Sequence, residues 1–280
     1  MKIIRLSSGL GNQMFMYAFF KHIEKKYKEP VFFDDKFFKS DRSGRKPEIS
    51  ILYNYDSYKF KFNPAGERRI KRIFYKTIRF LFPKFKYVKE KDYNDEKWYN
   101  GDVYFNGYWQ TCKYADQFGK KIFLPSGEIP LVLQDIEEKI KYSNCPVCIH
   151  FRRGDYFSPL YVKRYGVCTI DYYQRAIDRI ENILVNEQIT YFVFSDDINW
   201  VKNNISFAKE AVYVPNYPVN SIWYIKLMSL CKHNIISNST FSWWGAYLNS
   251  HCNKIVIGPE KWTFDQQTNP MCDNWLKINV

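Results

Sequence analysis

The stretch VCIHFRRGDY, residues 147–156, sets the fold predicted for the second half of the chain. Its first five residues form a mainly apolar run that is typical of a buried strand. Two arginines, Arg152 and Arg153, and the carboxylate of Asp155 follow. If the strand runs that far, its alternation sends the two arginines to opposite sides. One of them can then meet a ligand while the other pairs with a carboxylate; a structural ion-pair network is the alternative interpretation.

Predicted strands and helices alternate around this stretch. Strands are expected at residues 189–197, 211–214, 233–238 and 254–258, and helices at residues 171–182, 220–232 and 239–250. This alternation indicates a doubly wound α/β domain with a parallel sheet.

The N-terminal half also begins with a β-α-β pattern. A strand at 2–6, a helix at 14–27 and a strand at 31–35 predict a second parallel sheet. A strand and turn at 102–109 and a helix at 131–142 follow later in the sequence. The Pro- and Gly-containing segment before that helix indicates a domain junction, which we place near residue 142.

The composition is that of a globular and basic protein. The 280 residues suit one large or two medium domains, and 46% apolar residues can form a core. The formal charge is +13, and between Lys59 and Lys91 twelve Lys and Arg residues face only two acids. Such a patch attracts phosphates, nucleotide sugars, anionic lipids or nucleic acid. A helix predicted over 68–82 carries part of it, either as an ordinary surface helix or as an anion-binding one.

Cysteine usage and hydropathy indicate a protein of the cytoplasm. The seven cysteines include one CxxC, Cys145 to Cys148, with no second pair that would complete a zinc site. We expect reduced thiols beside a buried strand, and a redox pair is the alternative. The sequence shows no signal peptide and no apolar run of 18 residues, so we expect no membrane span.

Polar residues gather where predicted strands end. In open parallel sheets, ligands bind beyond the carboxyl ends of the strands. Four clusters have this placement: SSGLGNQ (7–13), HFRRGDY (150–156), SDD (195–197) and NSTFS (238–242). Their coincidence indicates a ligand site more strongly than any one cluster does.

Each cluster also has a purely structural interpretation. Gly9 and Gly11 let backbone amides approach a ligand, or they only form a tight turn. SDD can bind Mg²⁺ or Mn²⁺, but capping of the next helix is the favoured interpretation. NSTFS can hold a diphosphate or only cap its helix. Trp243 and Trp244 are expected in the core.

Taken together, GLGNQMFMYA, HFRRGDY, FSDD and NSTFSWWGAYL resemble the α-1,2-fucosyltransferases of glycosyltransferase family 11, with motifs spanning residues 9 to 248. The resemblance implies an α/β, GT-B-like fold of two Rossmann-type domains facing across a cleft. Residues 1–142 would be the acceptor-side domain and 143–280 the GDP-sugar-binding domain. It further implies GDP-β-L-fucose as donor, the 2-hydroxyl of a terminal galactoside as acceptor, inversion at the transferred sugar, and no metal or other cofactor.

The resemblance also implies roles for individual residues. Loss of the sugar leaves extra negative charge on GDP, which an arginine and helix-start amides can stabilise. Arg152 is then the pyrophosphate contact, Arg153 and Asp155 brace it or touch the sugar, and His150 helps to fix the nucleotide. Asn12 is expected near the reacting centre. Further donor-binding residues are Gly9, Gly11, Gln13, Asp196, Asp197, Asn238, Ser239, Thr240, Phe241 and Ser242.

Several points stay open at the level of sequence. Asp155 and His150 are both candidates for the catalytic base, and an SN1-like transition state needs none. Tyr224 stands where the family often has an acid that reads guanine, and Asp196 or Asp197 is expected to compensate. The region between Lys36 and Val103 matches no motif of the family.

Two rival functions and one further partner remain. A transferase of the same architecture could use another nucleotide sugar. A nucleic-acid-binding protein could use the basic, aromatic segment Lys59–Lys91, but this leaves HFRRGDY and NSTFS unexplained. We therefore expect no nucleic acid as partner. The same segment is a candidate contact with the anionic inner face of a membrane, where a lipid-linked galactose-terminated acceptor would lie.

Overall fold

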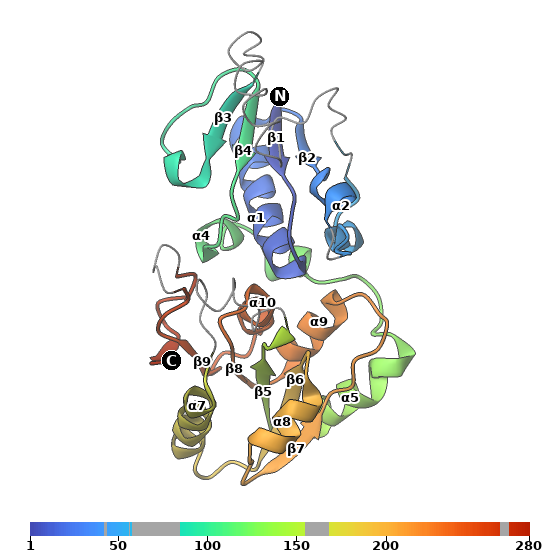
Figure 1. Cartoon of the computed structure of the whole chain (residues 1–280), viewed down its shortest axis with the longest axis vertical. Helices are drawn as coiled ribbons and strands as arrows, with labels where there is room; N and C mark the ends of the chain where they lie inside the picture. Colours follow the sequence, from blue (N-terminus) through green and yellow to red (C-terminus); the bar gives the residue numbers. More distant parts are fainter. Residues whose placement is uncertain (42–43, 56, 58–84, 155–167, 264–268) are drawn as a thin grey trace. The chain divides into compact units, whose positions relative to one another are not determined.

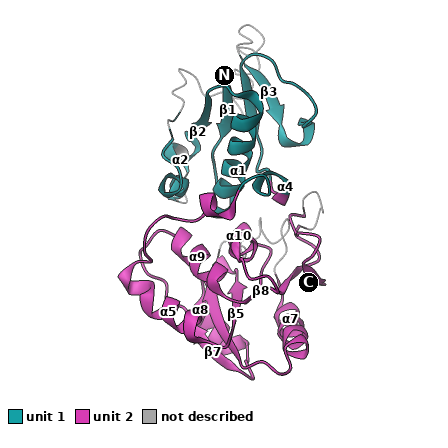
Figure 2. Cartoon of the chain, turned by 180° about the vertical axis from the view of Figure 1, so that it is seen from behind, with its two compact units in different colours: residues 1–109, 113–118 teal, residues 110–112, 119–280 magenta. Residues whose placement is uncertain are grey.

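The computed structural model describes residues 1–41, 44–55, 57, 85–154, 168–263 and 269–280 (Figure 1). Most of the basic segment Lys59–Lys91, with the helix predicted over 68–82, lies outside these ranges, as does Asp155. The chain divides into two compact units, Met1–Trp109 with Lys113–Phe118, and Gln110–Cys112 with Gly119–Val280 (Figure 2). Each unit contains its own parallel sheet, as the sequence predicts.

Unit 1 contains a four-stranded parallel sheet in the order β2-β1-β4-β3. Its strands are β1 (Lys2–Arg5), β2 (Val31–Asp34), β3 (Lys86–Lys89) and β4 (Val103–Asn106). The helix α1 (Leu10–Tyr27) connects β1 to β2, so the predicted β-α-β opening is confirmed. The edge strand β3 is too short and too rich in lysine to be recognised from its sequence.

The core of unit 1 is aromatic. The Phe19 ring of α1 stacks on the buried Trp109 ring, with 3.6 Å between centroids and 3° between planes. Phe105 of β4 meets Phe19 edge to face. Short helical segments complete the unit and its connection: α2 (Phe37–Ser40), η1 (Glu48–Ile51), η2 (Glu90–Asp92) and α4 (Cys112–Ala115). The many aromatic residues of this half of the sequence therefore form a packed core around α1.

Unit 2 contains a six-stranded parallel sheet in the order β10-β9-β8-β5-β6-β7. Its strands are β5 (Cys145–Phe151), β6 (Ile189–Ser195), β7 (Glu210–Tyr213), β8 (His233–Ile235), β9 (Val256–Pro259) and β10 (Leu276–Ile278). All except the short edge strand β10 agree with predicted strands. The helices are η3 (Lys120–Phe123), α5 (Leu131–Tyr142), α7 (Ile170–Ile183), α8 (Ile198–Asn204), α9 (Ile222–Leu230) and α10 (Thr240–Leu248).

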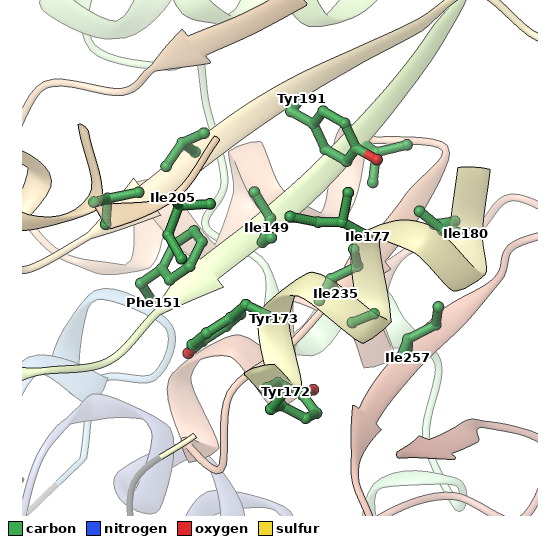
Figure 3. Close-up of a cluster of buried hydrophobic side chains, with 14 of the residues drawn as sticks. Ile149, Phe151, Tyr172, Tyr173, Ile177, Ile180, Tyr191, Ile205, Ile235 and Ile257 are labelled. Atoms are coloured by element: carbon green, nitrogen blue, oxygen red, sulfur yellow. The ribbon is translucent and has the colours of Figure 1, made fainter. Parts of the chain in front are cut away.

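Helices cover both faces of this sheet. On one face, Ile149 and Phe151 of β5 pack with Tyr173 and Ile177 of α7 (Figure 3). Val201 of α8 belongs to the same buried cluster. On the other face, the alternate β5 residue Cys148 packs with residues of α5 and α9. Every residue of β5 and β6 is buried, because helices cover both faces of the parallel sheet and neither face is exposed to solvent.

The division between the units falls earlier than the predicted boundary at residues 142 and 143. Leu133, Ile136 and Ile140 form the apolar stripe of α5, and they share a buried cluster with Leu227 and Met228 of α9. This helix therefore belongs to unit 2, which continues from Gly119. Its apolar spacing predicted the helix but could not say which sheet it would cover.

The seven cysteines are all free, and Cys145 and Cys148 are buried within β5. Across the ranges that the structure describes, no helix has both the length and the apolar composition that a membrane crossing requires.

Candidate functional site

Three of the four predicted polar clusters meet at one edge of unit 2. The strands β8, β5 and β6 are neighbours and run parallel, so the residues that follow them lie at the same end of the sheet. These are residues 237–242, 152–154 and 196–197. Adjacent strands are about 4.8 Å apart, which brings the clusters within reach of one ligand. The fourth cluster, residues 7–13, lies in unit 1.

Arg152 is held by Asp196. The Arg152 Nη1 atom lies 2.9 Å from Asp196 Oδ2, and the Arg153 backbone N–H donates to Asp196 Oδ1 at 2.9 Å. A Cβ atom on Gly154 would lie 2.6 Å from Asp196 Oδ2. A glycine at 154 therefore leaves the space in which the carboxylate sits, and the carboxylate orients the guanidinium just beyond β5.

Arg153 is engaged on the side of α8. Its guanidinium carbon lies 3.4 Å from the centroid of the Trp200 ring, and its Nε lies 3.4 Å from Asp197 Oδ2. Asp197 also caps α8, accepting from the Trp200 backbone N–H at 3.1 Å. The capping interpretation of SDD is thus confirmed for Asp197. Trp200 was not identified from the sequence; the signal was an aromatic residue in the first turn after two acids.

Among the residues that the structure describes, no three His, Cys, Asp or Glu side chains come together in a group that could hold a metal ion.

His150 is buried on the face of β5 opposite Phe151, since successive side chains of a strand alternate. Its Nδ1 lies 3.0 Å from the Ser237 hydroxyl, and its carbonyl accepts from the Tyr173 hydroxyl at 3.3 Å. Burial, assisted by the nearby Arg152 charge, lowers the pKa of His150 to about 3. The imidazole is therefore neutral at pH 7 and a weak proton acceptor, which argues against it as the general base.

Serine hydroxyls organise the start of α10. Ser239 caps the helix by accepting from the Phe241 backbone N–H at 3.3 Å. The Ser242 hydroxyl donates to the Ser239 carbonyl at 3.1 Å and lies 3.3 Å from the Ser237 hydroxyl. The Asn238 amide donates to the Trp262 carbonyl at 3.4 Å. Capping is thus observed for NSTFS, while Thr240 and Phe241 remain partly exposed at the helix start.

The rest of α10 is built for packing. Trp243 and Trp244 are fully buried, so their predicted place in the core is confirmed. The Trp243 Nε1–H donates to the Pro270 carbonyl at 2.7 Å. A Cβ atom on Gly245 would lie 2.6 Å from the Cβ of Met228 on α9. The absence of a side chain at Gly245 lets α9 and α10 approach closely and fixes where α10 begins.

The turn in unit 1 is arranged differently. Gly9 precedes α1 without any side-chain cap, and nothing lies within 4 Å of the Cβ it lacks. Gly11 is buried in the first turn of α1, and Asn12 is partly exposed there. The fully buried Gln13 donates to the carbonyls of Ser8 and Lys46 and accepts from the Ile49 N–H. Gln13 therefore holds the backbone of residues 8, 46 and 49 in place. Its amide is buried and engaged by these groups, so it is not presented to a sugar-nucleotide ligand.

Tyr224, whose place the resemblance assigns to an acid, is buried on α9. Its hydroxyl bonds to backbone groups of the loop between β7 and α9. This loop was not predicted from the sequence, although the PNYP stretch that it contains is typical of a rigid turn.

Comparison with known proteins identifies the family. The model of glycosyl transferase family 11 matches residues 54–279. The O-antigen biosynthesis glycosyltransferase WbnK of Escherichia coli is 32% identical, over 98% of this chain and 99% of that protein. An α-1,2-colitosyltransferase of Escherichia coli is 31% identical, over 99% and 98%. Galactoside α-(1,2)-fucosyltransferase 1 of Ateles belzebuth is 31% identical, over 36% of this chain and 28% of that protein.

A solved structure shares the fold. The α-1,6-fucosyltransferase NodZ of Bradyrhizobium, co-crystallised with GDP, matches with a TM-score of 0.51 at 14% identity. The match covers 88% of this chain and 92% of NodZ. The predicted GT-B-like α/β fold with parallel sheets is confirmed. With the family model covering most of its length, the chain belongs to glycosyl transferase family 11.

Proposed function

We propose that this glycosyltransferase moves L-fucose from GDP-β-L-fucose to the 2-hydroxyl of a terminal galactoside, with inversion. The observation that carries the proposal is the placement of Arg152 between the start of α10 and Asp196, at the carboxyl edge of the unit 2 sheet. The match to α-1,2-transferases supports the linkage. The O-antigen relative supports a bacterial surface glycan as acceptor.

Arg152 stabilises the leaving group in this mechanism. When the bond between fucose C1 and the diphosphate oxygen breaks, its electron pair stays on that oxygen. The released GDP therefore carries one more negative charge. A preoriented guanidinium lowers the energy of this developing charge. Backbone amides at the start of α10 add a favourable dipole from the neighbouring strand end. We propose that these groups suffice without a metal ion.

The proton of the acceptor hydroxyl needs an acceptor when the new glycosidic bond forms. His150 is disfavoured because its lowered pKa makes it a weak base. Asp155 stays the candidate from the sequence. Asn12, in the first turn of α1, is proposed to orient an acceptor or sugar group by hydrogen bonding.

Transfer of colitose is a second candidate, because an α-1,2-colitosyltransferase matches almost the whole chain. We take the colitose donor to be a GDP-sugar as well, so that Arg152 and the α10 start would act on the same leaving group. The two functions differ only in the sugar that the site accepts, so they are separated by offering both GDP-sugars and comparing kcat/KM.

The proposal is tested first by thermal shift with GDP, GDP-fucose, UDP and UDP-galactose, each with and without EDTA. A ligand that binds only the folded state raises the melting temperature by mass action. We expect stabilisation by the GDP compounds alone, unchanged by EDTA. Incubation with GDP-fucose and lactose should then yield an α-1,2-fucoside, identified by NMR.

Two variants make this test specific. Arg152→Ala should remove the shift and the activity, whereas Arg179→Ala, at an exposed arginine of α7, should change neither. Stabilisation by the UDP compounds, or its loss in EDTA, would overturn the assignment of a metal-free GDP-sugar transferase.

We also propose a peripheral contact with an anionic membrane through the basic segment Lys59–Lys91, which would bring the enzyme to lipid-linked acceptors. Sedimentation with vesicles of phosphatidylglycerol and phosphatidylcholine at low salt tests this contact. Failure to sediment would exclude it and leave the catalytic proposal intact.

A further inference from the structure

The loop between β7 and α9 extends the candidate site by one strand. The loop covers residues 214–221 and contains Pro215-Asn216-Tyr217-Pro218, and β7 is the neighbour of β6 at the end of the sheet. The Asn216 amide donates to the carbonyl of Ser195, the last residue of β6, at 3.0 Å. The loop is therefore fastened directly beside Asp196, at the same carboxyl edge as Arg152.

Hydrogen bonds to the hydroxyl of Tyr224, on α9, hold the backbone of this loop in place. The hydroxyl of this buried residue accepts from the Tyr217 N–H at 2.6 Å and donates to the Pro215 carbonyl at 3.1 Å. Two prolines restrict the loop further by fixing their own φ angles. A hydroxyl that both donates and accepts can hold two backbone groups at once, which a carboxylate in the same place could not do.

Tyr217 stands on this fixed loop with 39% of its surface exposed. Large aromatic side chains on the surface are the usual platforms on which a base stacks, because every base has a flat apolar face. A platform whose backbone is already fixed loses little conformational freedom when the ligand binds. The exposed ring and the fixed loop together are the features of a stacking platform.

Electrostatics decide which part of the donor meets this ring. Arg152 and the start of α10 attract the diphosphate at the ends of β5 and β8. At the end of β6, the Asp196 and Asp197 carboxylates disfavour phosphate, and Arg153 already contacts Asp197. The uncharged part of the donor is therefore directed toward β7. From β8 to β7 there are three strand spacings, about 14 Å, comparable with an extended nucleoside diphosphate.

We propose that Tyr217 stacks on the nucleobase of the donor, and that Tyr224 is a positioning residue that holds the Tyr217 loop in place. The inference rests on the proposed function only in that the donor is a GDP-sugar. It holds for fucose and for colitose. It also gives Tyr224 a part in donor recognition, through its bonds to the loop.

Calorimetric titration with GDP and with inorganic pyrophosphate tests the assignment. Tyr217→Ala should weaken GDP binding about tenfold, the size expected for one base on one aromatic ring, and leave pyrophosphate binding unchanged. Tyr217→Trp should restore the affinity for GDP. Tyr224→Phe should weaken GDP binding by a smaller factor and raise the KM for the donor with little change in kcat.

Matched controls separate this inference from the proposed function. Tyr142→Ala, at a tyrosine of α5 that is 84% exposed, should leave both affinities unchanged. Arg152→Ala should weaken the binding of both GDP and pyrophosphate. Unchanged GDP affinity in Tyr217→Ala, or an equal loss for pyrophosphate, would overturn the stacking role while the proposed function stands. A loss seen with GDP-fucose but not with GDP would also overturn it, because the ring would then face the sugar. Absence of GDP binding by the wild type would overturn both.

Discussion

The two units each place a turn of small polar residues between a strand and a helix, but they brace it with different chemistry. In unit 1 the turn at residues 7–13 is braced by Gln13, whose amide bonds three backbone groups. In unit 2 the turn at residues 237–242 is contacted by His150 of the neighbouring strand, through Ser237. An amide does not titrate, whereas an imidazole does. The two strand-to-helix turns therefore differ in their sensitivity to pH.

Lowering the pH should produce the largest difference in stability between the two turns. The folded pKa of His150, about 3, lies below its ordinary value of 6.5, because burial disfavours the charged ring. The unfolded state therefore takes up the proton first. Above pH 6.5 the ring is neutral in both states and its titration costs no stability. As pH falls toward 3, proton uptake by the unfolded state lowers the free energy of unfolding by up to roughly 5 kcal/mol. Chemical denaturation at several pH values between 7 and 4, followed by a signal that reports the unfolding of unit 2, measures this loss.

The comparison depends on His150 being the titrating group in that turn. His150→Gln should flatten the pH dependence, leaving the contribution of His233, whose pKa burial lowers to about 4. An undiminished slope in His150→Gln would show that the turn of unit 2 is no more sensitive to acid than that of unit 1.

Removal of the Gln13 amide should have the next largest effect. Gln13→Ala leaves the buried Ile49 N–H, and the partly buried hydrogen-bonding sites at the Ser8 and Lys46 carbonyls, without this partner. An unsatisfied buried N–H costs about 1–3 kcal/mol and water can reach the carbonyls, so we expect the free energy of unfolding of unit 1 to fall by about 2 kcal/mol. Urea denaturation at pH 7 measures it. The exposed Gln174→Ala on α7 is the control, and equal stability of the two variants would contradict the bracing role.

Two glycines offer a sharper contrast. Gly154→Ala would put a Cβ atom 2.6 Å from Asp196 Oδ2, so the carboxylate must move and Arg152 loses its orientation. We expect a loss of about 1–2 kcal/mol and a raised KM for the donor. Gly9→Ala meets open space at a φ of −76°, which alanine adopts readily, so the stability of unit 1 should stay within about 0.5 kcal/mol. Denaturation and donor kinetics on both variants check the contrast.

The smallest effect should come from the helix caps. Ser239 caps α10 with its hydroxyl, whereas α1 begins at Gly9 without a side-chain cap. Ser239→Ala should cost about 1 kcal/mol, while Gly9→Ser should stabilise unit 1 by a few tenths if the new hydroxyl finds an orphan amide. Thermal unfolding of both variants measures these changes. An unchanged melting temperature in Ser239→Ala would contradict the contribution of this cap to stability.

Local pattern alone determined most of the elements of this protein. The apolar run at β5, the helical spacing of α5 and α7, and the caps at Asp197 and Ser239 are short-range features, because each depends on residues a few positions apart. The resemblance carried by four motifs then led to the family and to the GT-B-like fold. Short edge strands such as β3 and β10 escaped prediction, since three or four residues contain too little of the alternating pattern.

Tertiary structure alone decided which residues meet. The order β8-β5-β6-β7 is not the order of the sequence, so no local pattern could show that Asp196 would hold Arg152 or that Asn216 would bond the end of β6. It also turned Gln13 inward and assigned α5 to unit 2, because burial is set by what packs on each face rather than by the spacing of apolar residues. The sequence supplied the chemical groups of the site, and the crossover connections of the parallel sheet brought them to one edge.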